Sequence, residues 1–161
     1  MSTIATALER DTIVWQPGEG GRFELVHDDD ALAWVDGDEV VLEGRRMVLE
    51  PTRGQLTLVD SGRGAKVAAM RLVGQGTGRV GAVTLARHRV RISKESVNPF
   101  QWHVTDDLGG LELLTGLMLF GRIRVKAGAD FDPGMDAGLA AVALALTAMP
   151  ELSAAVMADA A

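Results

Sequence analysis

The chain has 161 residues, of which 47% are hydrophobic and 24% are charged, and it contains no cysteine. This composition is that of a globular protein with a core, and it excludes a disordered chain, a disulfide framework and a cysteine-based metal site. The formal net charge of −6 and an aromatic content of only 4% argue against a nucleic-acid-binding protein. Because no basic and apolar leader follows Met1, we expect a cytoplasmic protein.

The charges are unevenly distributed along the chain. Residues 1–52 contain twelve acidic and four basic side chains, whereas residues 53–94 contain nine basic side chains and one acidic one. Residues 95–161 are acidic again, with nine acidic and three basic side chains. Such segregation indicates either a charged binding face or the pairing of acidic and basic strands across a sheet.

Short strand signals separated by tight turns run from about residue 12 to residue 126. The turn signals include Pro17–Gly21, Asp36-Gly37 and Ser61–Gly64, and strict apolar/polar alternation marks His88–Ile92 and Arg122–Lys126. About a dozen strands at this spacing are typical of a sandwich or barrel. No helical segment separates them, which argues against a parallel βαβ architecture.

One helix is predicted near the C-terminus, over about 133–149. Asp132 is suited to the N-cap, Pro133 to the first helical position, and Pro150 to the end. Thr147 is the only polar side chain between Asp136 and Glu151, so the helix is apolar on all sides. The apolar run is shorter than the roughly 20 residues that a membrane span needs, which favours a helix enclosed by the protein.

These two observations predict the fold. We expect a mainly β, single-domain protein covering residues 1–161, with a closed antiparallel β-barrel of about 12 strands around one long central hydrophobic helix. Residues 150–161 are expected to form a tail. The alternative is an open β-sandwich with the helix on one face, which would require a polar stripe on the helix.

The order of these elements resembles the tubby C-terminal-like fold, shared by tubby domains, phospholipid scramblases and plant LURP-one-related proteins. The similarity covers residues 12–150, and its most similar stretches are Trp102–Gly110, Gly121–Val125 and the apolar helix. In that superfamily these correspond to a strand, a turn containing Asp and Gly, a final strand and the central helix. Tubby domains bind phosphoinositide headgroups in a basic surface pocket. The resemblance therefore implies that a binding site of this chain should be sought among its basic surface residues.

The sequence contains one literal match to a nucleotide-binding motif. Gly76–Gly81 fits the spacing G-x-G-x-x-G, in which glycines allow close approach to a pyrophosphate. The segment that follows alternates like a strand and does not open a helix, so we interpret the glycines as a hairpin turn.

No catalytic or metal-binding constellation is predicted. His27 is followed by Asp28, Asp29 and Asp30, but this spacing does not match a calcium loop and indicates a solvated acidic turn. Ser93, Ser96, His103 and Asp106 are the residue types of a nucleophilic triad without a nucleophile-elbow pattern. We therefore expect no enzyme activity, no metal and no cofactor.

The best candidate binding residues are two basic trios, each on a strand in which basic and apolar residues alternate. Arg87, Arg89 and Arg91 form one trio, and Arg122, Arg124 and Lys126 form the other. Each trio could present a row of cations to phosphates or to an acidic partner, or could be a solvated strand face.

These observations predict a non-catalytic binding module that recognises an anionic ligand or phospholipid headgroup. The alternative is a structural or protein-interaction protein without a small-molecule ligand. The expected partner is an anionic membrane surface or another protein, with no role for nucleic acid. Exposure of the apolar region 113–120 would favour a protein partner.

Overall fold

The computed structural model describes residues 3–52, 55–73, 80–85, 89–94, 101–106, 112–118, 122–128 and 137–148. Within these ranges there are two α-helices, α1 (Thr3–Arg10) and α2 (Ala137–Ala148), and one 3-10 turn, η1 (Glu19–Gly21). The strands are β1 (Ile13–Pro17), β2 (Phe23–His27), β3 (Asp30–Asp36), β4 (Glu39–Leu42), β5 (Arg45–Thr52), β6 (Gln55–Asp60), β7 (Lys66–Val73), β8 (Val80–Leu85), β9 (Arg89–Lys94), β10 (Gln101–Asp106), β11 (Glu112–Met118) and β12 (Arg122–Ala127).

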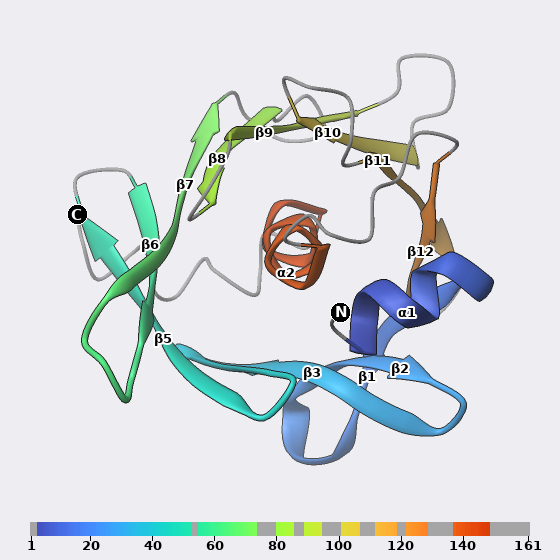
Figure 1. The fold of residues 1–161 in the computed structure, drawn as a ribbon, viewed down its shortest axis with the longest axis horizontal. Helices are drawn as coiled ribbons and strands as arrows, with labels where there is room; N and C mark the ends of the chain where they lie inside the picture. The colour runs from blue at the N-terminus through green and yellow to red at the C-terminus, as the bar shows by residue number, and fades with distance from the viewer. Residues whose placement is uncertain are drawn as a thin grey trace.

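The strands form one antiparallel sheet in which each strand pairs with the next one along the chain. The first and last strands also pair, with Ile13 opposite Val125 and Trp15 opposite Ile123. The sheet therefore returns to its starting strand, and the ribbon forms a ring when viewed down its axis (Figure 1). Pairing of β1 with β12 satisfies backbone groups that would otherwise lie on two open edges.

Alternation along the strands separates the inside of the ring from the outside. On β12, Ile123 and Val125 are buried, whereas Arg122, Arg124 and Lys126 are exposed. Successive side chains of a strand point to opposite faces of the sheet, so the apolar set faces inward and the cations face solvent.

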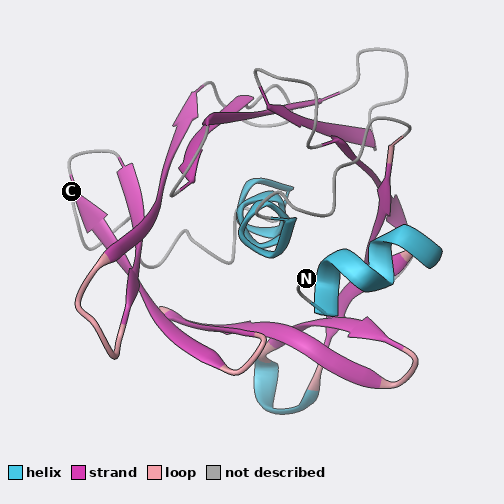
Figure 2. Ribbon diagram, viewed as in Figure 1, coloured by secondary structure: helices cyan, strands magenta, loops and turns pink. Residues whose placement is uncertain are grey.

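Helix α2 lies inside the ring of strands (Figure 2). Its residues 137–146 are all buried, and all of them except Gly138 belong to the same hydrophobic core as the strands. Close packing is visible at Gly138, where an added Cβ atom would lie 3.1 Å from Leu42 Cδ1. Small residues therefore allow the helix to fit within the ring.

Trp15 joins the strands to α2. Its side chain is fully buried, and its indole Nε1–H donates a hydrogen bond to the carbonyl oxygen of Ala141 at 3.2 Å. The indole of Trp15 also stacks on the phenyl ring of Phe23, with a centroid separation of 5.5 Å. A buried indole N–H needs an acceptor, so this contact fixes the position of the helix as well as burying area.

Helix α1 packs beside α2 and β12, with Ile4, Ala5, Ala7 and Leu8 buried (Figure 2). The backbone N–H of Ile4 donates to Glu43 Oε1 at 2.8 Å, from the turn between β4 and β5. A carboxylate at this position satisfies a free N–H of the first turn and complements the positive end of the helix dipole.

The predicted fold class is wrong in its helices. The sequence predicted one long central helix over about 133–149, whereas α2 is a short helix of 12 residues and α1 is a second short helix at the other end of the chain. The predicted capping residues Asp132 and Pro133 lie outside the described residues, as does the tail at 150–161. Helix α1 escaped prediction because eight residues give only two turns of periodicity, and its cap comes from Glu43, far away in sequence.

Candidate functional site

The described members of the two basic trios lie on the outside of the sheet. Arg89 and Arg91 on β9 are exposed and flank the buried Val90, and the three cations of β12 are exposed as well. Neighbouring cations of one row are two residues apart, which corresponds to about 7 Å along a strand. Arg87 of the first trio lies outside the described residues.

The two rows do not form one compact pocket. Strands β10 and β11 lie between β9 and β12 in the sheet. Three strand spacings separate the rows, which amounts to roughly 14 Å. The predicted basic residues therefore form two separate rows, and a single small anion cannot contact both.

Arg71 is a basic residue that sequence reasoning missed. It is exposed on β7, where the register places it opposite Ala82, and Ala82 lies opposite Arg91 on β9. Arg71 and Arg91 are therefore aligned across the sheet, two strand spacings or roughly 10 Å apart. The signal was present as a polar residue between Met70 and Leu72, but the cross-strand row exists only in the folded protein.

The cations of this side of the ring have no counterion among the described residues. No described carboxylate oxygen lies within 4.0 Å of Arg71, Arg89, Arg91, Arg122, Arg124 or Lys126. On the side formed by β2–β6, in contrast, Arg22 pairs with Glu24 at 2.6 Å, Arg46 with Glu39 at 2.9 Å, and Arg45 with Asp60 at 3.0 Å.

The Arg45–Asp60 pair also orders the turn after β6. The Asp60 carboxylate accepts hydrogen bonds from Arg45 Nη2 and from the backbone N–H groups of Gly62 and Arg63. The hydrogen bond from Arg45 holds the pKa of Asp60 below its ordinary value, with smaller help from the two backbone donors and against the effect of desolvation. This carboxylate therefore has a structural role.

The predicted acidic turn lies beside a groove on the outside of β1 and β2. The groove has a volume of about 630 Å³ and is lined by Asp11, Thr12, Val14, Gln16, Val26, His27, Asp28 and Asp29. Asp28 and Asp29 form the β2–β3 turn with φ values of 48° and 68°, a left-handed conformation that Asp tolerates in two-residue hairpins. His27 Nε2 lies 3.0 Å from Asp11 Oδ2.

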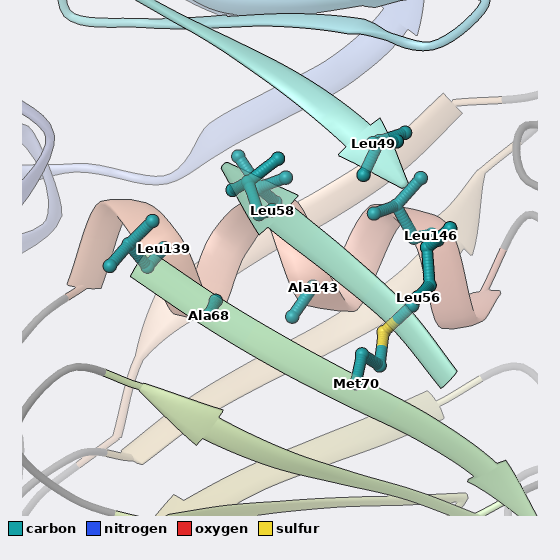
Figure 3. A pocket seen from close by; sticks show the side chains of 9 residues that line it. Leu49, Leu56, Leu58, Ala68, Met70, Leu139, Ala143 and Leu146 are labelled. Atoms are coloured by element: carbon teal, nitrogen blue, oxygen red, sulfur yellow. The ribbon is translucent and has the colours of Figure 1, made fainter. Parts of the chain in front are cut away.

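A second hollow lies inside the ring, between α2 and strands β5–β7 (Figure 3). It is lined by Leu49, Leu56, Leu58, Ala68, Met70, Leu139, Val142, Ala143 and Leu146. Its volume of about 20 Å³ is close to that needed for a single water molecule, and its lining is apolar. We interpret it as a packing defect that is too small for a metabolite.

The fold does not assemble the remaining sequence motifs into a site among the described residues. Ser93 on β9 lies directly opposite His103 on β10 in the register, whereas Ser96 lies outside the described residues. Residues 76–79 of the glycine motif also lie outside them, and Val80 and Gly81 begin strand β8. A strand at this place contradicts the helix that a dinucleotide fingerprint requires.

Neither helix in the described part of the chain has the length and apolarity needed to cross a bilayer. Comparison with family models, with curated proteins and with solved structures gives no match to the chain. The resemblance to the tubby C-terminal-like superfamily therefore stays a prediction from the order of elements, and function has to be argued from the surface itself.

Proposed function

We propose that the protein is a binding module for an extended anionic surface, with phospholipid headgroups as the ligand class. The observation that carries the proposal is the set of exposed cations on β7, β9 and β12 without a described counterion. Exposed arginines bind phosphate oxygens through charge-assisted hydrogen bonds, often two at a time.

The spacing of the rows favours a surface over a single small ligand. Cations of one row are about 7 Å apart, and the rows on β9 and β12 are separated by roughly 14 Å. Each row can contact a different phosphate of a headgroup layer, and each cation near such a layer contributes about 1 kcal/mol. Affinity would then come from the sum of several weak contacts.

The opposite side of the ring would orient the protein on such a surface. Residues 1–52, which form α1 and β1–β5, contain twelve acidic and four basic side chains. An anionic surface repels this side and attracts the side formed by β7–β9, whereas β12 lies next to β1, at the border between the two sides (Figure 1). The protein would therefore bind in one preferred orientation.

Vesicle co-sedimentation tests the proposal. The full chain is mixed with neutral phosphatidylcholine vesicles, or with the same vesicles containing phosphatidylserine or a phosphoinositide, at low and at high salt. We expect binding to both kinds of anionic vesicle at low salt, loss of binding at high salt, and no binding to neutral vesicles. Preference for the phosphoinositide would identify a specific headgroup.

Two matched variants locate the binding side. In the first, Arg89→Gln, Arg91→Gln, Arg122→Gln and Arg124→Gln remove four exposed cations, and we expect at least a tenfold loss of vesicle binding. In the control, Arg22→Gln, Arg45→Gln and Arg46→Gln remove cations that are paired with carboxylates, and binding should change less than threefold. No binding to any vesicle would refute the proposal and would leave a protein partner as the alternative.

A further inference from the structure

Three side chains from separate segments meet in the lining of the groove on β1 and β2. Asp11 lies between α1 and β1, His27 ends β2, and Asp28 begins the turn to β3. Their potential ligand atoms all lie within 4.8 Å of one another. The sequence shows His27 and Asp28 as neighbours, but the fold adds Asp11 from 16 residues away.

Two of the three separations lie close to those between ligands of a single metal ion. His27 Nε2 lies 3.0 Å from Asp11 Oδ2 and 3.6 Å from Asp28 Oδ2. Two ligands bound at 2.0–2.2 Å to one tetrahedral ion are about 3.4 Å apart. The imidazole can offer the Nε2 lone pair when its proton is on Nδ1, so the three groups can converge on one ion.

The surroundings leave coordination positions open on one side. The donors lie at the edge of the groove of about 630 Å³, so water can complete the coordination shell. The His27 side chain is the least exposed of the three at 22%, compared with 58% for Asp11 and 83% for Asp28. His27 is thus the positioned ligand, and the carboxylates are free to adjust around it.

We propose that Asp11, His27 and Asp28 bind a divalent first-row transition metal ion of the Zn²⁺ class. An imidazole nitrogen with two carboxylates suits Zn²⁺ better than Ca²⁺, which takes six to eight oxygen ligands. Three protein ligands with open positions resemble the ligand number of a catalytic zinc site more than the four ligands of a structural one.

The cations on β12 would repel a metal ion bound at this site. Val14, which lines the groove, lies opposite Arg124 in the β1–β12 register. Neither Arg124 nor Lys126 lies within ion-pairing distance of the three donors in the part of the chain that the structure describes. The carboxylates are therefore available to an ion, at an affinity lowered by these nearby positive charges.

Isothermal titration calorimetry of the full chain with Zn²⁺ alone tests the proposal, with Ca²⁺ titrated under the same conditions. We expect one Zn²⁺ per chain and at least tenfold weaker binding of Ca²⁺. Titration with Co²⁺ should give visible absorption bands that depend on His27. Binding of Ca²⁺ as tight as that of Zn²⁺, or no Zn²⁺ binding at millimolar concentration, would overturn the proposal.

The turn offers a matched pair of variants. Asp28→Asn and Asp29→Asn remove the same charge from adjacent left-handed positions, and Asn tolerates this conformation as well as Asp does. We expect Asp28→Asn, Asp11→Asn and His27→Ala to weaken Zn²⁺ binding at least tenfold, and Asp29→Asn to change it less than threefold. Equal losses for Asp28→Asn and Asp29→Asn would show diffuse attraction to an acidic turn and would contradict the site. Circular dichroism and thermal unfolding of each variant check that the fold is retained.

Discussion

The two sides of the ring use their arginines differently. On the β2–β6 side, Arg22, Arg45 and Arg46 each pair with a carboxylate, and Arg22 also lies over the Trp34 ring at 4.5 Å. On the β7, β9 and β12 side, the exposed cations have no described counterion. Paired arginines hold turns and strands together, whereas cations left to solvent add little to stability and remain available for a ligand.

This comparison assumes that both sides share one well-packed interior, and Trp15 tests that assumption. We expect Trp15→Ala to lower the free energy of unfolding by about 3–5 kcal/mol, because it leaves a cavity and removes the hydrogen bond to Ala141. Chemical denaturation measures the change. Trp34→Ala, on the outer face, is the control and should cost about 1 kcal/mol. Equal losses for both variants would contradict the assignment of inner and outer faces.

The acidic side contains carboxylates with a defined acceptor role, and Glu43 is the clearest. We expect Glu43→Ala to lower the free energy of unfolding by about 1 kcal/mol, because the N–H of Ile4 loses its partner and α1 loses a negative charge at its N-terminus. Glu43→Gln keeps an acceptor oxygen and should cost less. If Glu43→Ala is as stable as the wild type, the contact does not anchor α1.

The Arg45–Asp60 pair predicts a smaller effect that depends on pH. Because the folded protein lowers the pKa of Asp60, the carboxylate contributes stability above its unfolded pKa of about 4, and this contribution is lost as the pH falls through the lowered folded value. Urea denaturation from neutral pH to about pH 2 should show Asp60→Asn less stable than wild type at neutral pH, with the difference shrinking below about pH 4. A difference that is constant with pH would show that ionisation of Asp60 is not involved.

The smallest effect on stability is expected on the basic side. Arg89→Gln with Arg91→Gln should change the free energy of unfolding by less than about 0.5 kcal/mol, since no described partner is lost. Thermal unfolding at low and high salt measures this change, and Arg46→Gln with Arg45→Gln provides the paired counterpart. A large loss of stability in the first variant would show that these cations hold the fold together and would weaken the binding proposal.

Short sequence patterns predicted several elements of this fold. The alternation at Arg89, Val90, Arg91 and Ile92 correctly predicted a strand with cations outside and apolar residues inside. The apolar run within 137–148 likewise predicted a buried helix, although its length was overestimated. These features depend on periods of two and 3.6 residues, which a short window of sequence contains.

The binding side illustrates the limit of such patterns. The sequence places Arg87, Arg89 and Arg91 in one trio and Arg122, Arg124 and Lys126 in another, but it does not say how far apart the trios lie. The sheet order puts β10 and β11 between them and places Arg71 in the same row as Arg91. Register between neighbouring strands depends on pairing of the whole sheet, so no single strand contains this information.

The sequence by itself determined where most strands lie, which strand faces are apolar, and that an apolar helix lies near the C-terminus, but it did not reveal α1. Only the tertiary structure decided the meetings between distant segments. These are the pairing of β1 with β12, the cap that Glu43 provides for α1, and the approach of Asp11 to His27. The physical reason is that side-chain alternation and turn chemistry act over a few residues, whereas these contacts form only when burial of the common core brings remote parts of the chain together.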